Sequence, residues 1–255
     1  LYARWNGKTF NVSFDKQNGT GGTTSVAATF NANMPSAFAP SRTGYIFKGY
    51  FDGRNGTGTQ YYSASMSSLH KWDKSSTGTL YAYWEARTYT VSFNYNNGTG
   101  ITNSVIATYD SAMPTISDVP TRTGYIFTGY YDSANNGTKY YNADLASVKT
   151  WDKTSNTTLY AHWVGVDYSV RFDGNGSTSG RMDNQAFVYA TAQNISTNAF
   201  VRTGYTFVGW NTESDGSGTS YSNSASVNNL TTENNGTVVL YAQWRANTYK
   251  VSLDG

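Results

Sequence analysis

Hydrophobic and polar residues alternate over several short stretches of the chain, which is the pattern of a β-strand with one buried face. Tyr89, Val91 and Phe93 would point to one side of such a strand, with polar residues between them. A turn rich in Gly and Asn at 96–100 separates this stretch from a second alternating stretch at 105–109. The two stretches are therefore predicted to form a β-hairpin.

The same pattern returns at a spacing of about 80 residues, which indicates a repeat architecture. The segments RTGYIFKGYFD, RTGYIFTGYYD and RTGYTFVGWNT begin at Arg42, Arg122 and Arg202. A second marker, LYAxW, ends at Trp5, Trp84, Trp163 and Trp244. The segment YKVSLDG, which begins at Tyr249, matches the first strand of each repeat. We therefore predict complete repeats at 8–86, 87–165 and 166–246, the end of another repeat at 1–7, and the start of a further one at 247–255.

Each predicted repeat continues from the hairpin through a link, the RTGY strand, a short tyrosine segment and the closing LYAxW strand. The link contains spaced prolines in the first two repeats, so one or two helical turns are the most it can hold. Short tyrosine segments at Tyr61, Tyr140 and Tyr221 follow the RTGY strand. Because Leu and Ile are few, the core must be built largely from aromatic rings. In the first repeat we predict core positions at Phe14, Tyr45, Phe47 and Trp84.

The joins between repeats are short, and this bears on the shape of the array. Only Glu85–Thr88 separate the closing strand of the first repeat from the first strand of the second. A join of four residues cannot act as a floppy tether. Similar joins should impose similar rotations, so the sequence predicts an extended, twisted rod of repeats.

The combination of TVSF, an Asn-Gly turn, RTGYxFxGY and LYAxW resembles the Listeria-Bacteroides repeat family, which includes the B repeats of internalin-type surface proteins. The resemblance covers essentially all 255 residues. It implies a mostly β, α+β module of β-grasp-like type, found in tandem on secreted bacterial proteins, and hence an extracellular location at the bacterial cell surface or in secreted form. The family has no shared catalytic residues. The chain departs from the family pattern by an insertion at WDKSS from Trp72 and WDKTS from Trp151.

Composition excludes several partners and chemistries. Charged residues make up 13% of the chain and the net charge is +2, with no basic run that could neutralise a row of phosphates, so we expect no nucleic-acid partner. There is no cysteine, which excludes disulfides and thiolate metal clusters. No apolar run approaches the length needed to span a bilayer, so we expect no membrane insertion of this segment.

Candidate chemistry is sparse. The two histidines, His70 and His162, fall at different positions of the repeat, which favours surface residues over a metal site or an acid–base pair. Asp73 and Asp152 occupy the same place in separate repeats, so they cannot form a carboxylate pair within one site, and a structural turn is the better interpretation. No catalytic or nucleotide-binding motif occurs. We therefore predict no enzyme activity, no cofactor and no metal.

Three recurring positions remain. Gly44, Gly124 and Gly204 are predicted to supply a backbone shape that a side chain would obstruct. Arg42, Arg122 and Arg202 are predicted to bond nearby carbonyls or carboxylates, with ligand binding as the alternative. The aromatic residues Tyr50, Tyr130 and Trp210 fall opposite in phase to the inward set. They are therefore either exposed rings that could make adhesive contacts or rings that cover the other face of the sheet.

These observations favour a non-catalytic structural spacer or fibre-shaft segment of a larger extracellular bacterial surface protein. The alternative is an adhesive module that binds glycans or host or partner proteins through exposed aromatic residues. The expected partners are the neighbouring repeats of the same chain, and beyond them other copies in a fibre or surface glycans and proteins. An enzyme would need convergent titratable groups in a pocket, for which an 80-residue two-layer unit has little room.

Overall fold

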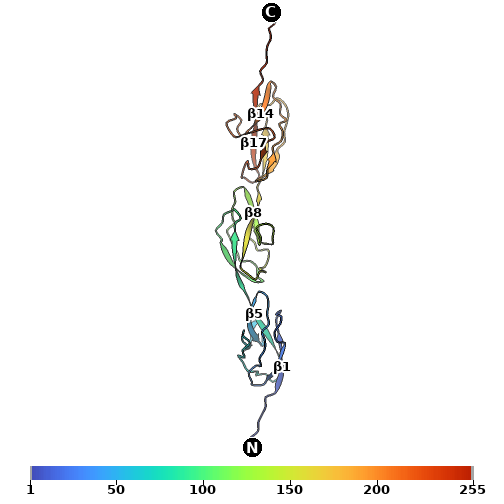
Figure 1. The fold of residues 1–255 in the computed structure, drawn as a ribbon, viewed down its shortest axis with the longest axis vertical. Coiled ribbons are helices and arrows are strands. Elements are labelled where there is room, and N and C mark those ends of the chain that lie inside the picture. Colours follow the sequence, from blue (N-terminus) through green and yellow to red (C-terminus); the bar gives the residue numbers. More distant parts are fainter. Residues whose placement is uncertain (1, 254–255) are drawn as a thin grey trace. The chain divides into compact units, whose positions relative to one another are not determined.

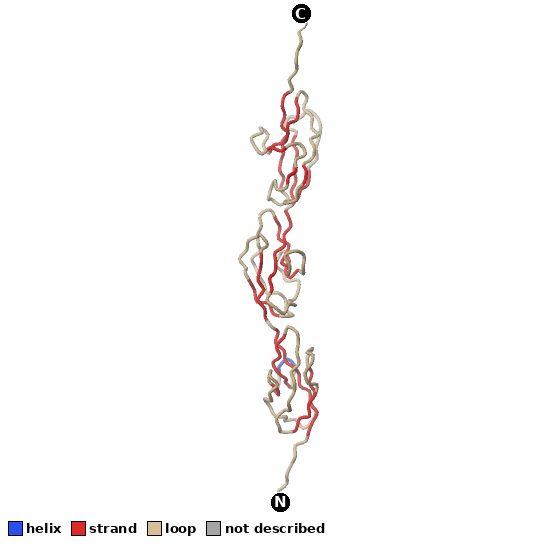
Figure 2. The backbone as a smooth tube through the Cα atoms, viewed as in Figure 1, coloured by secondary structure: helices blue, strands red, loops and turns tan. Residues whose placement is uncertain are grey.

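The computed structural model describes residues 2–253 and consists of strands joined by loops (Figures 1 and 2). Among these residues there is one helical element, the three-residue 3₁₀ turn Arg54–Gly56. The described residues form two compact units, each of which is described by itself. The second unit contains Tyr95–Ile101, Asp118–Tyr130 and the residues from Tyr160 onward, and the first contains the rest.

The first repeat is a curled, five-stranded mixed sheet. Its strands are β1 (Thr9–Asp15), β2 (Ser25–Thr29), β3 (Tyr45–Phe51), β4 (Gln60–Tyr62) and β5 (Gly78–Ala86), in the spatial order β2-β1-β5-β3-β4. The central strands β1 and β5 are parallel, and the other neighbouring pairs are antiparallel. The expected hairpin β1–β2 and the LYAxW strand β5 are therefore confirmed, and the closing strand lies at the centre of the sheet.

The other two repeats have the same strand order. The second contains β6 (Thr88–Asn94), β7 (Ser104–Thr108), β8 (Tyr125–Tyr131), β9 (Lys139–Asn142) and β10 (Thr157–Gly165). The third contains β11 (Asp167–Asp173), β12 (Gln185–Val188), β14 (Tyr205–Asn211), β15 (Ser220–Tyr221) and β17 (Gly236–Ala246). A small two-stranded sheet of β13 (Gln193–Asn194) and β16 (Ser226–Val227) is added in the third repeat.

The core of the first repeat is aromatic, as expected, but its membership differs from the prediction. Phe14 is buried, and Phe47 and Trp84 are half-buried against the core cluster. The Trp84 indole N–H donates to the carbonyl of Lys16, 2.9 Å away, and so ties the closing strand to the first turn. Tyr45 was predicted as a core residue, and this is wrong: it lies outside the cluster and packs instead against Tyr109.

The sequence prediction missed the largest core residues. Trp72 and Trp151, in the loops that precede β5 and β10, are fully buried. Each packs against a buried tyrosine, with ring centroids 5.3 Å apart for Tyr61–Trp72 and 5.4 Å for Tyr140–Trp151. The WDK segment therefore completes the core in the first two repeats.

The proline-containing link has no helical turn, although one or two turns were allowed by the prediction. In the first repeat its backbone is bonded to the preceding hairpin instead. The amide of Thr23 donates to the carbonyl of Phe38 at 3.1 Å, and the amide of Thr20 donates to Ser41 at 2.7 Å. The link therefore runs along the hairpin as an extended segment.

A β-bulge in the RTGY strand changes which side chains point to the core, and simple alternation along the strand does not predict this change. The register shifts between Phe47 and Gly49 in β3 and between Phe207 and Gly209 in β14. One extra residue at the bulge brings the next aromatic residue to the same face as the preceding phenylalanine. Gly49 and Gly209 take φ values of +126° and +149°, which favour glycine.

The interpretation of Tyr50, Tyr130 and Trp210 as exposed rings is therefore wrong. All three have no exposed surface, and each lies within its own repeat's core. Tyr50 packs on Phe14 with ring centroids 4.5 Å apart, and Trp210 packs on Phe172 at 4.9 Å. They are core residues, and they offer no surface to a glycan or a protein.

Replacing the bulge glycine should test this account of the strand. A Cβ on Gly49 would collide with the carbonyl oxygen of Tyr62, and its φ is unfavourable for other residues. We expect Gly49→Ala to lower the free energy of unfolding of the first repeat by about 2 kcal/mol or more, measured by urea unfolding. Gly21→Ala is the control, because Gly21 also has a positive φ, of +66°, but lies outside the bulge with open space around it. Equal losses in the two variants would contradict the bulge as the source of the constraint.

Candidate functional site

The most regular feature outside the cores is a contact that we call the tyrosine joint, formed in the first unit by Gly44, Tyr45, Arg87 and Tyr109. The Tyr109 ring meets the Tyr45 ring edge to face, with centroids 5.7 Å apart and planes at 77°. It also lies directly on Gly44, where any Cβ would collide with it. Gly44 is buried and has a φ of +78°, so the prediction that a side chain would be obstructed is confirmed at this glycine.

Backbone hydrogen bonds hold the ring of Tyr109 in place. The amide of Arg87, in the join between the first two repeats, donates to the carbonyl of Gly44 at 2.9 Å. The carbonyl of the same residue accepts the amide of Tyr109, also at 2.9 Å. Arg87 thus connects the glycine and the tyrosine through its backbone.

Side chains add to this joint. The Arg42 guanidinium lies over the Tyr45 ring, 3.7 Å from the centroid, and donates to the carbonyl of Gln17 at 3.4 Å. The Tyr45 hydroxyl donates to Asp110 at 3.1 Å. Burial, and next this bond to the carboxylate, raises the pKa of Tyr45 above its ordinary value. A cleft of about 310 Å³ opens beside the joint, lined by Asn18, Thr20, Ser41, Arg42, Thr43, Tyr45, Tyr109 and Asp110.

The second unit contains the same joint, formed by Gly124, Tyr125, Val166 and Tyr189. The two tyrosine rings lie 5.4 Å apart with planes at 78°, and a Cβ on Gly124 would collide with the ring of Tyr189. Val166 donates to the carbonyl of Gly124 at 3.0 Å and accepts the amide of Tyr189 at 2.9 Å. Arg122 stacks on Tyr125 at 3.8 Å. The glycine, the two rings, the stacked arginine and the backbone bonds are therefore the constant parts of the joint.

The predicted role of the recurring arginines is confirmed in part. Arg42 and Arg122 each donate to a backbone carbonyl, that of Gln17 and that of Asn96, both at 3.4 Å. The stacking of these arginines on the tyrosine of the same RTGY motif, Tyr45 or Tyr125, was not predicted. The constant spacing of the arginine and the tyrosine was nevertheless visible in the sequence. A stacked guanidinium of this kind stabilises by about 0.5–1 kcal/mol at an exposed site.

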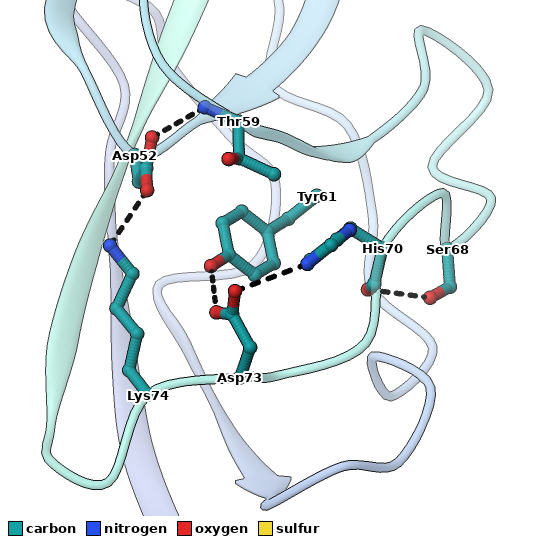
Figure 3. A network of polar contacts seen from close by, with 7 residues as sticks. All are labelled: Asp52, Thr59, Tyr61, Ser68, His70, Asp73 and Lys74. Atoms are coloured by element: carbon teal, nitrogen blue, oxygen red, sulfur yellow. Dashed lines mark hydrogen bonds and ion pairs between the residues drawn. The ribbon is translucent and has the colours of Figure 1, made fainter.

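The second recurring feature is a polar network around the WDK segment (Figure 3). Asp73 accepts the Tyr61 hydroxyl at 2.5 Å and lies 3.2 Å from Nε2 of His70. Asp52 accepts the amide of Thr59 at 2.7 Å and pairs with Lys74, also at 2.7 Å. These bonds attach the loop that carries Trp72 to the edge of the sheet.

The second repeat keeps this network without a histidine. Asp152 accepts the Tyr140 hydroxyl and pairs with Lys149 at 2.9 Å, at the position that His70 occupies in the first repeat. Asp132 and Lys153 repeat the pair of Asp52 and Lys74 at 2.7 Å. The third repeat lacks the WDK segment, and there Thr212 Oγ1 accepts the amide of Thr219 at 2.9 Å in place of the aspartate contact.

The pKa shifts of the groups in this network favour a fixed structural role. Burial, and next the Asp73 carboxylate, raises the pKa of Tyr61 well above its ordinary value. The Tyr61 hydroxyl in turn lowers the pKa of Asp73. Burial alone would raise the pKa of Asp52, but the Lys74 ammonium and the Thr59 amide outweigh it and lower that pKa overall. The phenol stays protonated and the carboxylates ionised at neutral pH, so these groups are poorly matched to proton transfer.

The structure assigns the remaining candidates as follows. His70 belongs to the polar network of the first repeat. The backbone carbonyl of His162 accepts the Thr128 hydroxyl at 3.1 Å. Asp73 and Asp152 serve as acceptors for buried tyrosines. Among residues 2–253 no group of three or more His, Asp and Glu side chains is arranged to hold a metal. No helix in the same range is long and apolar enough to cross a bilayer.

Sequence reasoning missed Tyr109 and Tyr189 as joint residues. Both follow directly after the second strand of their hairpin, at the same position of the repeat. Their recurrence, 80 residues apart, was visible in the sequence. What could not be seen was that the ring turns toward the RTGY glycine, because this depends on contacts distant in sequence.

Comparison with known proteins agrees with the repeat analysis. The pattern of the Listeria-Bacteroides repeat domain matches residues 10–82, 89–162 and 168–243. A protein of Evansella cellulosilytica described as a candidate membrane protein is 32% identical over 99% of this chain and 35% of its own length. A candidate Gly-rich membrane protein of the same organism is 28% identical over 99% of this chain and 26% of its own length.

Internalin H of Listeria monocytogenes is 35% identical over 56% of this chain and 24% of its own length. The chain thus spans about a third or less of each of these relatives. Because the repeat pattern matches three times in succession and covers most of the sequence, the chain belongs to the Listeria-Bacteroides repeat family.

Proposed function

We propose that this chain is a non-catalytic structural spacer or fibre-shaft segment of a larger bacterial surface protein. The observation that carries the proposal is the recurrence of the tyrosine joint where each repeat passes to the next. In both joints a tyrosine ring covers a glycine that has no room for a side chain. A joint that limits bending between successive modules is what a spacer requires.

The setting of the relatives supports this proposal. Internalin H and the two candidate membrane proteins carry the repeats within much longer chains. We propose by analogy that the segment lies outside the cell, at the bacterial surface or in a secreted protein. There it would separate other parts of the protein from their attachment point.

The strand order supports a β-grasp-like module without its helix. A mixed five-stranded sheet with its first and last strands parallel at the centre is the arrangement observed in each of the outer repeats. In the first repeat the extended, proline-containing link takes the place of a crossover helix. Such a small module gains stability from its neighbours, which favours a tandem array over isolated units.

The residues expected to make adhesive contacts do not lie at the surface. Tyr50, Tyr130 and Trp210 are fully buried, so a glycan or protein could reach them only if the repeats unfolded. We therefore propose the spacer role alone.

Small-angle scattering on the monomeric chain tests the spacer proposal. A compact globule of this length would have a radius of gyration of about 18 Å. Three strand-built repeats held end to end should give about 26 Å or more. The compact value would show that the repeats fold back on one another, and the spacer proposal would then fail.

Removing the ring of the first joint should loosen that joint selectively. We expect Tyr109→Ala to speed amide hydrogen exchange at Arg87 by about tenfold, because an aromatic pair contributes about 0.5–1.5 kcal/mol beyond its buried area. The matched control is Phe30→Ala, since Phe30 holds the same position in the first repeat and is 43% exposed. Unchanged exchange at Arg87 in Tyr109→Ala would mean that the ring does not hold the joint.

A further inference from the structure

The third repeat contains the glycine and the tyrosine of the RTGY motif, as in the two joints, but among residues 2–253 no second tyrosine ring lies on the glycine. Gly204 has a φ of +81°, like Gly44 and Gly124, but a Cβ placed there would meet nothing within 4 Å. Gly44 and Gly124 are buried, whereas Gly204 is exposed. Tyr205 is 38% exposed, whereas Tyr45 and Tyr125 are half-buried under their partner rings.

The other parts of the joint are already in place around this surface. Arg202 stacks on Tyr205 with its guanidinium carbon 4.0 Å from the ring centroid. The amide of Asn247 donates to the carbonyl of Gly204 at 2.9 Å, as Arg87 and Val166 do in the two complete joints. We call the surface formed by Arg202, Gly204, Tyr205 and Asn247 the third socket. It has the backbone shape and the stacked arginine of the filled joints.

We propose that the third socket binds an aromatic side chain from the first hairpin of a following repeat, joined through 247–253. The proposal rests on the spacer function and adds a specific docking residue to it. The segment TYKVSL from Thr248 matches TYTVSF from Thr88, the first strand of the second repeat. The relatives are all more than twice as long as this chain, so the matching segments lie within longer proteins.

The filled joints fix where the docking residue should lie. Tyr109 follows the joining residue Arg87 by 22 positions, and Tyr189 follows Val166 by 23. In the first repeat Phe30 follows Lys8 by 22 positions, and its amide donates to the carbonyl of Lys8 at 2.8 Å. The occupant of the third socket is therefore an aromatic residue 22 or 23 positions after Asn247, held by a backbone bond to that residue.

The chemistry of the socket favours a flat aromatic ring over other side chains. Gly204 leaves room for a ring to lie against the backbone, and such a ring can meet Tyr205 in a T-shaped pair, as in the other joints. A lysine or arginine side chain would lose hydration there and would meet the like charge of the Arg202 guanidinium, which is stacked on Tyr205.

The proposal can be tested by extending the chain and measuring the reactivity of Tyr205. The extended protein consists of residues 1–249 followed by a copy of residues 90–165, which places a copy of Tyr109 at the required position. Tetranitromethane modification is mapped by mass spectrometry, with the fully exposed Tyr2 as internal reference. We expect Tyr205 to react several-fold faster than Tyr125 in the original chain, and at the rate of Tyr125 in the extended chain.

Two variants make the result specific. Alanine in place of the added copy of Tyr109 should restore the fast reaction of Tyr205. In the original chain, Tyr189→Ala should expose Tyr125 and raise its rate to that of Tyr205, and this arm can still refute the proposal if the added repeat does not fold.

The proposal fails if Tyr205 stays reactive beside a folded added repeat, or if Tyr189→Ala leaves Tyr125 protected. Protection of Tyr205 in the original chain that increases with protein concentration would also overturn it, because the occupant would then be a second copy. A compact radius of gyration with a protected Tyr205 would reject the spacer role and leave the docking intact, so the two failures can be told apart.

Discussion

The arrangement depends on one close approach: an aromatic ring lying on a glycine whose φ is positive. At Gly44 and at Gly124 the peptide backbone is open to the ring of a tyrosine some 65 residues further along the chain. Any Cβ would occupy the space of that ring, and the left-handed backbone is itself unfavourable for other residues. The RTGY motif therefore encodes a contact with the following repeat as well as a strand of its own repeat.

Glycine also determines how aromatic side chains are placed within a repeat. Gly49 and Gly209 allow the bulge that brings two aromatic residues three positions apart to one face of a strand. This raises the density of rings in a core that has few aliphatic residues. Trp72 and Trp151, clamped by aspartate–tyrosine hydrogen bonds in their loops, fill the remaining space. The third repeat lacks this tryptophan and uses a wider set of half-buried residues, including Leu230 and Tyr221.

Local sequence patterns predicted the repeats, the hairpins and the closing strands because alternation and turn chemistry act over a few residues. They could not place Tyr50 and Trp210, since a single extra residue at the bulge reverses the face of every later side chain. They placed Tyr45 in the core of its own repeat, because local patterns cannot show that its partner, Tyr109, lies in the next repeat. They did not reveal that the tryptophan of the WDK segment is buried, because its burial depends on contacts across the whole module. Errors thus fell where a side chain's environment is set by distant residues.

The central claim is that the tyrosine joint restricts the motion of one repeat relative to the next. The absence of cysteine allows spin labels to be placed cleanly, for example by Asn11→Cys and Ser104→Cys at exposed positions of the first and second repeats. Double electron–electron resonance should give one narrow distance distribution in this labelled chain, and a clearly broader one when Tyr109→Ala is added. A distribution that is already broad with the tyrosine present, or that does not change without it, would contradict the claim.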